Sequence, residues 1–212
     1  MKKIMFEDTR FRLEQAVLDG RKTMTRRVVP FDDPELAQWN IEGLTPSEIE
    51  KKYLPKSTYK VGDKVAIAQR YLAIRSQIKT DEEKAAFEKK VRAAYDVKEF
   101  NEIEATHNKS FAKSQLMPHH IEITKVSVER LQEIRWKEAV MEGVIMEIEH
   151  GKDDMGNRIT VDLYRVNGIN ERFTHPVSAF IALINRISPK LFGLPMWDAN
   201  PLVYVYSFKL ID

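Results

Sequence analysis

The chain has 212 residues, of which 43% are hydrophobic and 31% charged, and its formal net charge is +2. This is the composition of a folded protein, and so small a net charge gives no general argument for a nucleic-acid partner. The absence of cysteine excludes disulfides, cysteine-ligated zinc and thiolate catalysis. No apolar run reaches the ~18 residues of a membrane helix, and the start is not a secretion signal. We therefore expect a cytoplasmic protein with no membrane partner.

The first predicted elements are a short strand and a helix. The apolar residues KIMF, at 3–6, indicate the strand, and Asp8 and Thr9 are good N-caps for the helix that follows. Gly20 suits the position just after the last helical turn. The segment GRKTMTRR, residues 20–27, therefore begins where a helix ends, and it holds four cations among eight residues.

Loops, a short helix and a strand are predicted next. Pro30 and Pro34 mark a loop, and the polar region after it contains a short helix at 46–53. Gly62 and Asp63 form a turn pair, and the strand that follows begins near Val65.

A charged amphipathic helix is predicted from Thr80. Thr80 and Glu83 match a capping box. Apolar residues then recur at spacings of four, at Phe87, Val91 and Tyr95. The residues around this helix are rich in lysine and glutamate, and 99–115 show no clear period. We expect a helical insertion at about 79–115 in a single domain that spans 1–212.

The next predicted strand is HHIEITKVSVERL, and its apolar residues change face part of the way along. Ile121 and Ile123 lie on one face, whereas Val126 and Val128 lie on the other. This phase change predicts a bulge or a barrel corner near Thr124.

Four further elements are predicted towards the C-terminus. A helix over RWKEAVMEGV is closed by Gly143, and a hairpin turns around Met155–Asn157. A second amphipathic helix, VSAFIALINRI, ends before Pro189. The last strand is PLVYVYSFKLI, whose alternating apolar residues form a core stripe. These elements indicate a mixed α+β fold, a small closed or half-closed β-barrel with flanking helices.

The segment GRKTMTRR fits the pattern G-x-K-x-x-x-x-R through Gly20, Lys22 and Arg27. Three more blocks follow in order: VGDKV, then IEITKVSVERLQEI with EAVMEGV, then W-x-x-N-P-x-V-x-x-x-x-F from Trp197 to Phe208. Together they resemble the ASCH domain family in its phage and prophage branch. The resemblance covers most of the chain apart from about 79–115 and the hairpin of the 150s. It implies a PUA-like β-barrel associated with RNA.

One type of protein in this family is a small amidohydrolase that deacetylates N4-acetylcytidine, and it is similar in the G-R-K-T-x-T-x-R segment. The resemblance implies a catalytic lysine at Lys22, a threonine nucleophile at Thr25 and a catalytic glutamate at Glu142. The remaining polar residues of the segment would bind substrate or nucleic acid: Arg21, Thr23, Arg26 and Arg27. This chain is longer than that type and has Arg26 where that type has an apolar residue.

The implied roles set chemical and geometric conditions. Thr25 becomes a nucleophile only if a neutral amine takes its proton, so the pKa of Lys22 must fall by about 3 from ~10.4. Like charge from the neighbouring arginines favours this fall. Glu142 would lie in the last helical turn, where the helix dipole disfavours a carboxylate, which suits proton transfer. Lys22 and Thr25 would point to opposite faces of a regular strand, so the strand must begin only at about Arg26.

Other interpretations fit the same residues. The basic cluster could be a solvated helix terminus, Glu142 an exposed helix residue and Thr25 a simple strand residue. Trp136, Tyr204 and Tyr206 could stack bases or pack in the core. The function could accordingly be that of an RNA or modified-nucleoside binding module without catalysis, or of a ribonuclease in which cations stabilise a phosphorane. No metal or organic cofactor is implied, and the oligomeric state is not predicted.

Overall fold

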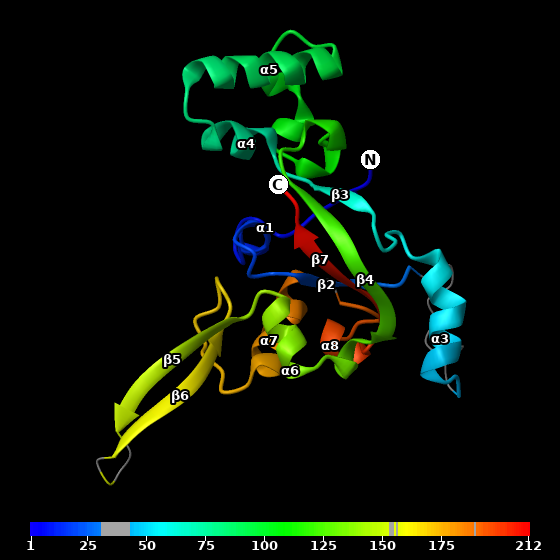
Figure 1. Cartoon of the computed structure of the whole chain (residues 1–212), viewed down its shortest axis with the longest axis vertical. Coiled ribbons are helices and arrows are strands. Elements are labelled where there is room, and N and C mark those ends of the chain that lie inside the picture. The colour runs from blue at the N-terminus through cyan, green and yellow to red at the C-terminus, as the bar shows by residue number, and fades with distance from the viewer. Residues whose placement is uncertain (31–42, 153–154, 156, 189) are drawn as a thin grey trace. The chain divides into compact units, whose positions relative to one another are not determined.

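A computed structural model describes residues 1–30, 43–152, 155, 157–188 and 190–212 (Figure 1). These residues form a mixed α/β structure with a five-stranded sheet, a separate two-stranded sheet and seven α-helices. The loop expected at Pro34, part of the turn expected around Met155–Asn157 and the stop at Pro189 lie outside them. Among the described helices, none has the length and apolarity needed to cross a membrane.

The larger sheet has the strand order β1-β3-β4-β7-β2. Its strands are β1 Lys3–Ile4, β2 Met24–Val28, β3 Lys64–Ile67, β4 His120–Arg130 and β7 Leu202–Leu210. β1 is parallel to β3, whereas the pairs β3–β4 and β2–β7 are antiparallel. Pairing among the described residues does not close these strands into a barrel, so the PUA-like barrel stays a prediction.

The chain divides into two compact units made from interleaved stretches. One unit consists of 1–6, 64–122 and 210–212, and the other of 7–63 and 123–209. The prediction of one domain over 1–212 stays a prediction.

The first unit contains the whole of the predicted insertion range, 79–115. Its helices are α4 Tyr71–Gln77, α5 Asp81–Tyr95 and four short 3-10 helices, η2 Phe100–Glu102, η3 Glu104–Thr106, η4 Lys109–Phe111 and η5 Ser114–Leu116. Thr80 caps α5 in the predicted capping box with Glu83. Val91 is fully buried, and Phe87 packs against the same apolar cluster. The amphipathic helix is therefore confirmed.

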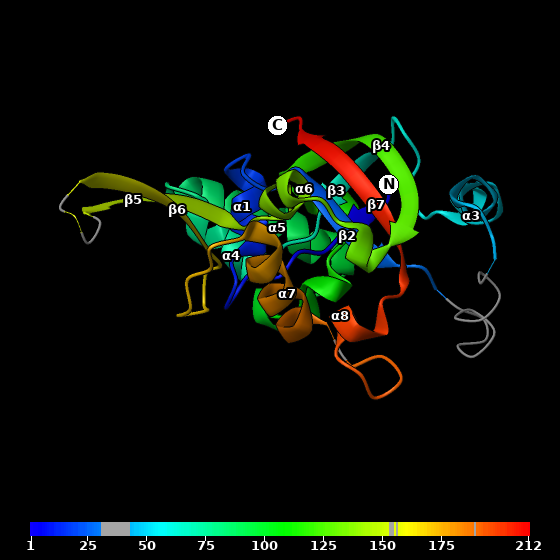
Figure 2. The same ribbon diagram turned by 90° about the horizontal axis from the view of Figure 1, so that it is seen from below.

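The second unit contains the candidate site. Its helices are α1 Leu13–Leu18, α3 Pro46–Tyr53, η1 Leu54–Lys56, η6 Leu131–Glu133, α6 Trp136–Met141, α7 Pro176–Ile187 and α8 Met196–Ala199. Strands β5 Ile145–Lys152 and β6 Arg158–Arg165 form the predicted hairpin, which extends away from α6 and α7 (Figures 1 and 2). In Figure 1, α6 and α7 lie next to each other, and they are in direct contact.

The predicted caps of α1 are half right. Arg12, not Asp8 or Thr9, is the N-cap residue, because the carboxylate of Glu7 accepts the N–H groups of Thr9, Arg10 and Phe11 and folds this stretch into a turn before the helix. Gly20 follows the helix with φ 71°, as predicted.

The predicted phase change in β4 is confirmed by burial. Ile121 and Ile123 are fully buried, and Thr124 and Lys125 are exposed. Val128, which falls on the other face by strand alternation, is buried. Figure 2 shows β4 as a strongly curved strand. In β7 the predicted stripe is buried as far as Phe208, and Leu210 is half-buried. The alternate positions Val203 and Val205 are buried too, whereas Lys209 is exposed, so both faces are covered only in the first part of the strand.

Candidate functional site

Lys22 lies in the short connection between α1 and β2, outside the regular strand. Its backbone N–H donates to the carbonyl of Ala16 at 2.8 Å, and the N–H of Thr23 donates to the carbonyl of Met141 at 3.0 Å. These bonds attach the connection to α1 on one side and to α6 on the other. Since β2 starts at Met24, the strand begins two residues earlier than the chemistry had required.

The side chains of Lys22 and Glu142 form a buried ion pair. The Nζ of Lys22 lies 2.6 Å from Oε2 of Glu142 and donates also to the main-chain carbonyl of Glu142 at 2.8 Å. The two side chains are only 2% and 5% exposed. Glu142 is the C-cap residue of α6, and Gly143 follows with φ 104°. The structure thus joins two residues that the resemblance had assigned to catalysis.

Arg26 holds the other oxygen of Glu142. Its Nη1 lies 3.2 Å from Oε1 of Glu142, and its Nη2 lies 2.6 Å from Glu129 and 2.8 Å from Glu138. Its Nε donates to Glu129 as well, at 3.1 Å. The guanidinium is 1% exposed, so its N–H groups are engaged by glutamates and not by solvent. Arg135 adds a second cation to Glu138 at 2.7 Å.

The charges in this cluster shift one another's pKa values. Burial lowers the pKa of the Lys22 ammonium; Glu142 opposes that effect, while Arg27 and Arg26 add to it, and the net direction is downward. Burial also lowers the pKa of Arg26, but Glu142, Glu129 and Glu138 outweigh it and the net direction is upward. Lys22 is therefore the member of the cluster that gives up its proton more readily than usual.

Thr25 is buried within β2, and the register of the sheet fixes its face. It lies directly opposite Tyr206 in the antiparallel pair β2–β7, and Arg27 lies opposite Tyr204. Because side chains alternate along a strand, Thr25 and Arg27 share one face and Arg26 occupies the other. The hydroxyl of Thr25 makes no hydrogen bond within the described residues. The network of Lys22, Arg26 and Glu142 does not include Thr25.

A tyrosine cluster covers the face that carries Thr25. The hydroxyl of Tyr206 lies 2.9 Å from that of Ser57, and the ring of Tyr59 meets the ring of Tyr206 edge-on with centroids 5.1 Å apart. Tyr204 donates to the carbonyl of Tyr53 at 3.0 Å. Tyr204 and Tyr206 are buried and raised in pKa by that burial. The core interpretation therefore holds for these two tyrosines.

The other polar residues of the segment differ in their surroundings. Arg27 is exposed, yet the protein around it lowers the pKa of its guanidinium by desolvation, with Tyr59 and Glu142 opposing. Arg21 is exposed at the end of α1 and pairs with Asp19 at 3.0 Å. Thr23 is half-buried.

Glu129 and Glu138, the two carboxylates that bind Arg26 together with Glu142, were not singled out in the sequence analysis. A signal existed for Glu138, because it stands four residues before Glu142 and so lies on the same side of α6. Nothing in the local pattern distinguishes Glu129 from other charged residues of β4. Trp136 is 52% exposed, with Lys137 Nζ 5.3 Å from its ring centroid, so the core interpretation is wrong for this residue.

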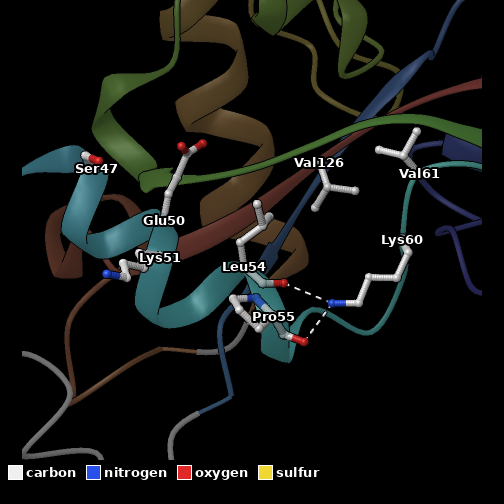
Figure 3. A pocket seen from close by; sticks show the side chains of 8 residues that line it. All are labelled: Ser47, Glu50, Lys51, Leu54, Pro55, Lys60, Val61 and Val126. Atoms are coloured by element: carbon white, nitrogen blue, oxygen red, sulfur yellow. Dashed lines mark hydrogen bonds between the residues drawn. The ribbon is translucent and has the colours of Figure 1, made fainter.

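A separate groove of about 620 Å³ runs along α3 (Figure 3). Its lining residues are Ser47, Glu50, Lys51, Leu54, Pro55, Lys60, Val61 and Val126. Figure 3 shows the Lys60 ammonium bound to the carbonyls of Leu54 and Pro55, at 3.0 and 2.7 Å. None of these residues belongs to the charge cluster. A common pocket for Lys22, Thr25 and Glu142 stays a prediction.

Within the described part of the chain, no group of three or more His, Asp or Glu residues is arranged to hold a metal ion. No family model matches the chain, and neither the curated proteins nor the solved structures contain a match. The chemistry of the site therefore follows from its own contacts.

Proposed function

We propose that this protein is an ASCH-type amidohydrolase with a PUA-like barrel, and that it removes the acyl group from an acylated nucleoside such as N4-acetylcytidine. The observation that carries the proposal is the buried ion pair of Lys22 and Glu142, 2.6 Å apart, in which the pKa of the lysine is lowered. A lysine and a glutamate that exchange a proton over so short a distance can act as a base and an acid in turn.

The first step of the proposed reaction produces a neutral amine. Moving one proton from Nζ of Lys22 to Oε2 of Glu142 gives a neutral lysine and a neutral carboxylic acid. Burial favours this direction, because neither neutral group has to be desolvated as an ion. Arg26 opposes it by stabilising the carboxylate of Glu142. Arg26 is thus a positioning residue in this proposal, and its guanidinium sets how readily Glu142 accepts the proton.

In the second step, the oxygen of Thr25 attacks the amide carbonyl. The Thr25 proton passes to Lys22, a C–O bond forms, and the carbonyl electron pair becomes an oxyanion. When the C–N bond breaks, the proton on Glu142 passes to the leaving amine of the base. A water molecule then attacks the acyl-threonine, which releases acetate and restores the Thr25 hydroxyl. The sum is amide plus water giving amine plus carboxylic acid.

Substrate contacts are proposed for the accessible cations of the segment. Arg27 lies on the face of β2 that carries Thr25 and remains exposed, so it is placed to hold the oxyanion or a phosphate of the substrate. Arg21 and Thr23 precede it at the rim of the same connection. Arg26 contributes less to substrate binding, since carboxylates engage its guanidinium.

The test is release of acetate from N4-acetylcytidine, with binding of the same nucleoside measured in parallel. Thr25→Val keeps the shape of the side chain and removes the hydroxyl, and Lys22→Arg keeps a cation that cannot give up its proton. Each should reduce turnover by about 100- to 10,000-fold. Arg172→Gln, at an exposed ion pair away from the segment, is the control and should retain full turnover.

Two outcomes would overturn the proposal. Wild-type protein that binds N4-acetylcytidine and releases no acetate is a binding module. If Thr25→Val retains the turnover of the wild type, Thr25 is not the nucleophile and the mechanism described here is wrong.

A further inference from the structure

A polar cavity of about 490 Å³ lies in the first unit, and none of its lining residues takes part in the proposed reaction. It is formed where α4, α5 and η2 meet, and its lining residues are Leu72, Arg75, Glu88, Arg92, Glu99, Phe100 and Asn101. Its volume is in the range typical of small-molecule sites. Two arginines from different helices therefore line one partly open cavity.

The donors of these two arginines are largely unused by the protein. Arg75 donates through Nε to Glu88, and Arg92 donates through Nη1 to the carbonyl of Lys98 at 3.0 Å. The Nε of Arg92 is shielded from solvent and has no hydrogen-bond partner among the described residues. A buried donor without an acceptor costs about 1–3 kcal/mol. Because that Nε is shielded, the donors that an acceptor in the cavity could reach are the Nη groups of Arg75 and the Nη2 group of Arg92, which bind no protein acceptor among the described residues.

We propose that this cavity binds a phosphate group carried by a small molecule. A planar carboxylate offers two oxygens and can be matched by one guanidinium. A phosphate offers tetrahedrally arranged oxygens and can accept from guanidiniums on two helices at once. Asn101 supplies a neutral amide donor at the edge of the same cavity, and Leu72 and Phe100 supply an apolar wall for the rest of the ligand.

Glu88 and Glu99 oppose the binding of an anion, so the proposal predicts that removing one of these charges strengthens binding. Glu88 occupies one N–H group of Arg75, so an incoming phosphate competes with it. Glu88→Gln removes the competing charge and should strengthen phosphate binding. Arg92→Gln removes a cationic donor and should weaken it. General electrostatic attraction of an anion would produce the same two signs, so a site is distinguished by a much larger loss in Arg92→Gln than in a matched change of an exposed lysine on the same helix.

The experiment follows the arginine Nε–H and backbone amide NMR signals of the full chain during titration. The probes are inorganic phosphate, cytidine 5′-monophosphate, cytidine and a short single-stranded RNA. Phosphate and the nucleotide should shift the signals of Arg75 and Arg92, and cytidine should not. Arg92→Gln should weaken nucleotide binding about tenfold or more. Lys89→Gln, an exposed change of the same charge on α5, should leave it within about twofold.

Asn101→Asp is the second variant in case Arg92→Gln does not fold. It adds a negative charge at the cavity edge and should also abolish the shifts. Equal responses to nucleotide and cytidine, or equal losses in Arg92→Gln and Lys89→Gln, overturn the proposal. Shifts produced by RNA alone would also overturn it, because the ligand would then be a phosphodiester chain. The outcome does not depend on the reaction proposed for Lys22 and Glu142.

Discussion

The ion pair of Lys22 and Glu142 should be strongly coupled in stability. At 2.6 Å between Nζ and Oε2, the Coulomb attraction is about 6 kcal/mol at an effective dielectric constant of ~20. Much of that attraction is offset by the desolvation of two nearly buried side chains. Removing the Glu142 carboxylate takes away the counter-charge of the buried Lys22 ammonium, which typically costs about 3–5 kcal/mol. Removing Lys22 costs less, because Arg26 still pairs with Glu142.

A double-mutant cycle of Lys22→Met and Glu142→Gln measures the coupling. Both changes keep approximately the size of the side chain and remove its charge. We expect Glu142→Gln to lose about 3–5 kcal/mol of the free energy of unfolding, and Lys22→Met to lose less because Arg26 still pairs with Glu142. Because the double variant no longer contains an unpaired charge at either position, it should lose less than the sum, by about 2 kcal/mol or more. The measurement is urea unfolding at neutral pH, followed by circular dichroism.

The exposed pair of Arg21 and Asp19 provides the matched control. Its side chains are 40% and 41% exposed, and its N–O distance is 3.0 Å. The cycle of Arg21→Gln with Asp19→Asn should give a coupling below about 1 kcal/mol. If the cycle at Lys22 and Glu142 gives a coupling as small as this control, the two groups do not interact as a buried ion pair, and the proton exchange proposed above has no structural basis.

Three further predictions concern stability. Burial lowers the pKa of Lys22 in the folded state below its unfolded value near 10.4. Between these two pKa values the unfolded chain binds more protons than the folded chain, so the wild type should gain stability relative to Lys22→Met as the pH rises through that window. A difference in melting temperature that stays constant with pH would contradict this. Gly168→Ala should cost more than about 2 kcal/mol, because φ is +73° and the new Cβ would lie 2.6 Å from the carbonyl oxygen of Arg10. Gly62→Ala, at φ +86° with no atom within 4 Å, should cost only the backbone strain of about 1–2 kcal/mol, and equal losses in urea unfolding would refute the steric argument. Arg26→Lys should lose about 3 kcal/mol or more because one ammonium cannot serve three carboxylates, and a thermal unfolding curve like that of the wild type would be the contrary result.

Elements with a strong local pattern were predictable from the sequence. The capping box at Thr80 and the spacing of apolar residues determine α5, and Gly20 determines the end of α1. The hairpin of β5 and β6 likewise pairs neighbouring stretches of the chain. In each case the interactions that stabilise the element join residues close in sequence, so periodicity and capping contain most of the necessary information.

Features that depend on the packing of whole elements could not be predicted from the local sequence. Trp136 looks like a core residue by its apolar character and helical spacing, yet it is exposed because Glu138 and Ala139 form the buried side of α6. The start of α1 was misplaced for a different and local reason. The sequence offers Asp8 and Thr9 as caps, but the carboxylate of Glu7 binds the nearby N–H groups first.

The sequence by itself determined that cations gather after α1 and that a glutamate ends α6. Only the tertiary structure decided what they do, because Lys22 and Glu142 are 120 positions apart and meet at 2.6 Å. Strand alternation predicts that Arg26 and Arg27 face opposite ways, but it does not say which of them is buried. Packing of α6 and β4 against β2 gives Arg26 three glutamates, while Arg27 stays exposed on the face of Thr25. Identical side chains acquire different roles because burial and partner charges are set by segments distant in the chain.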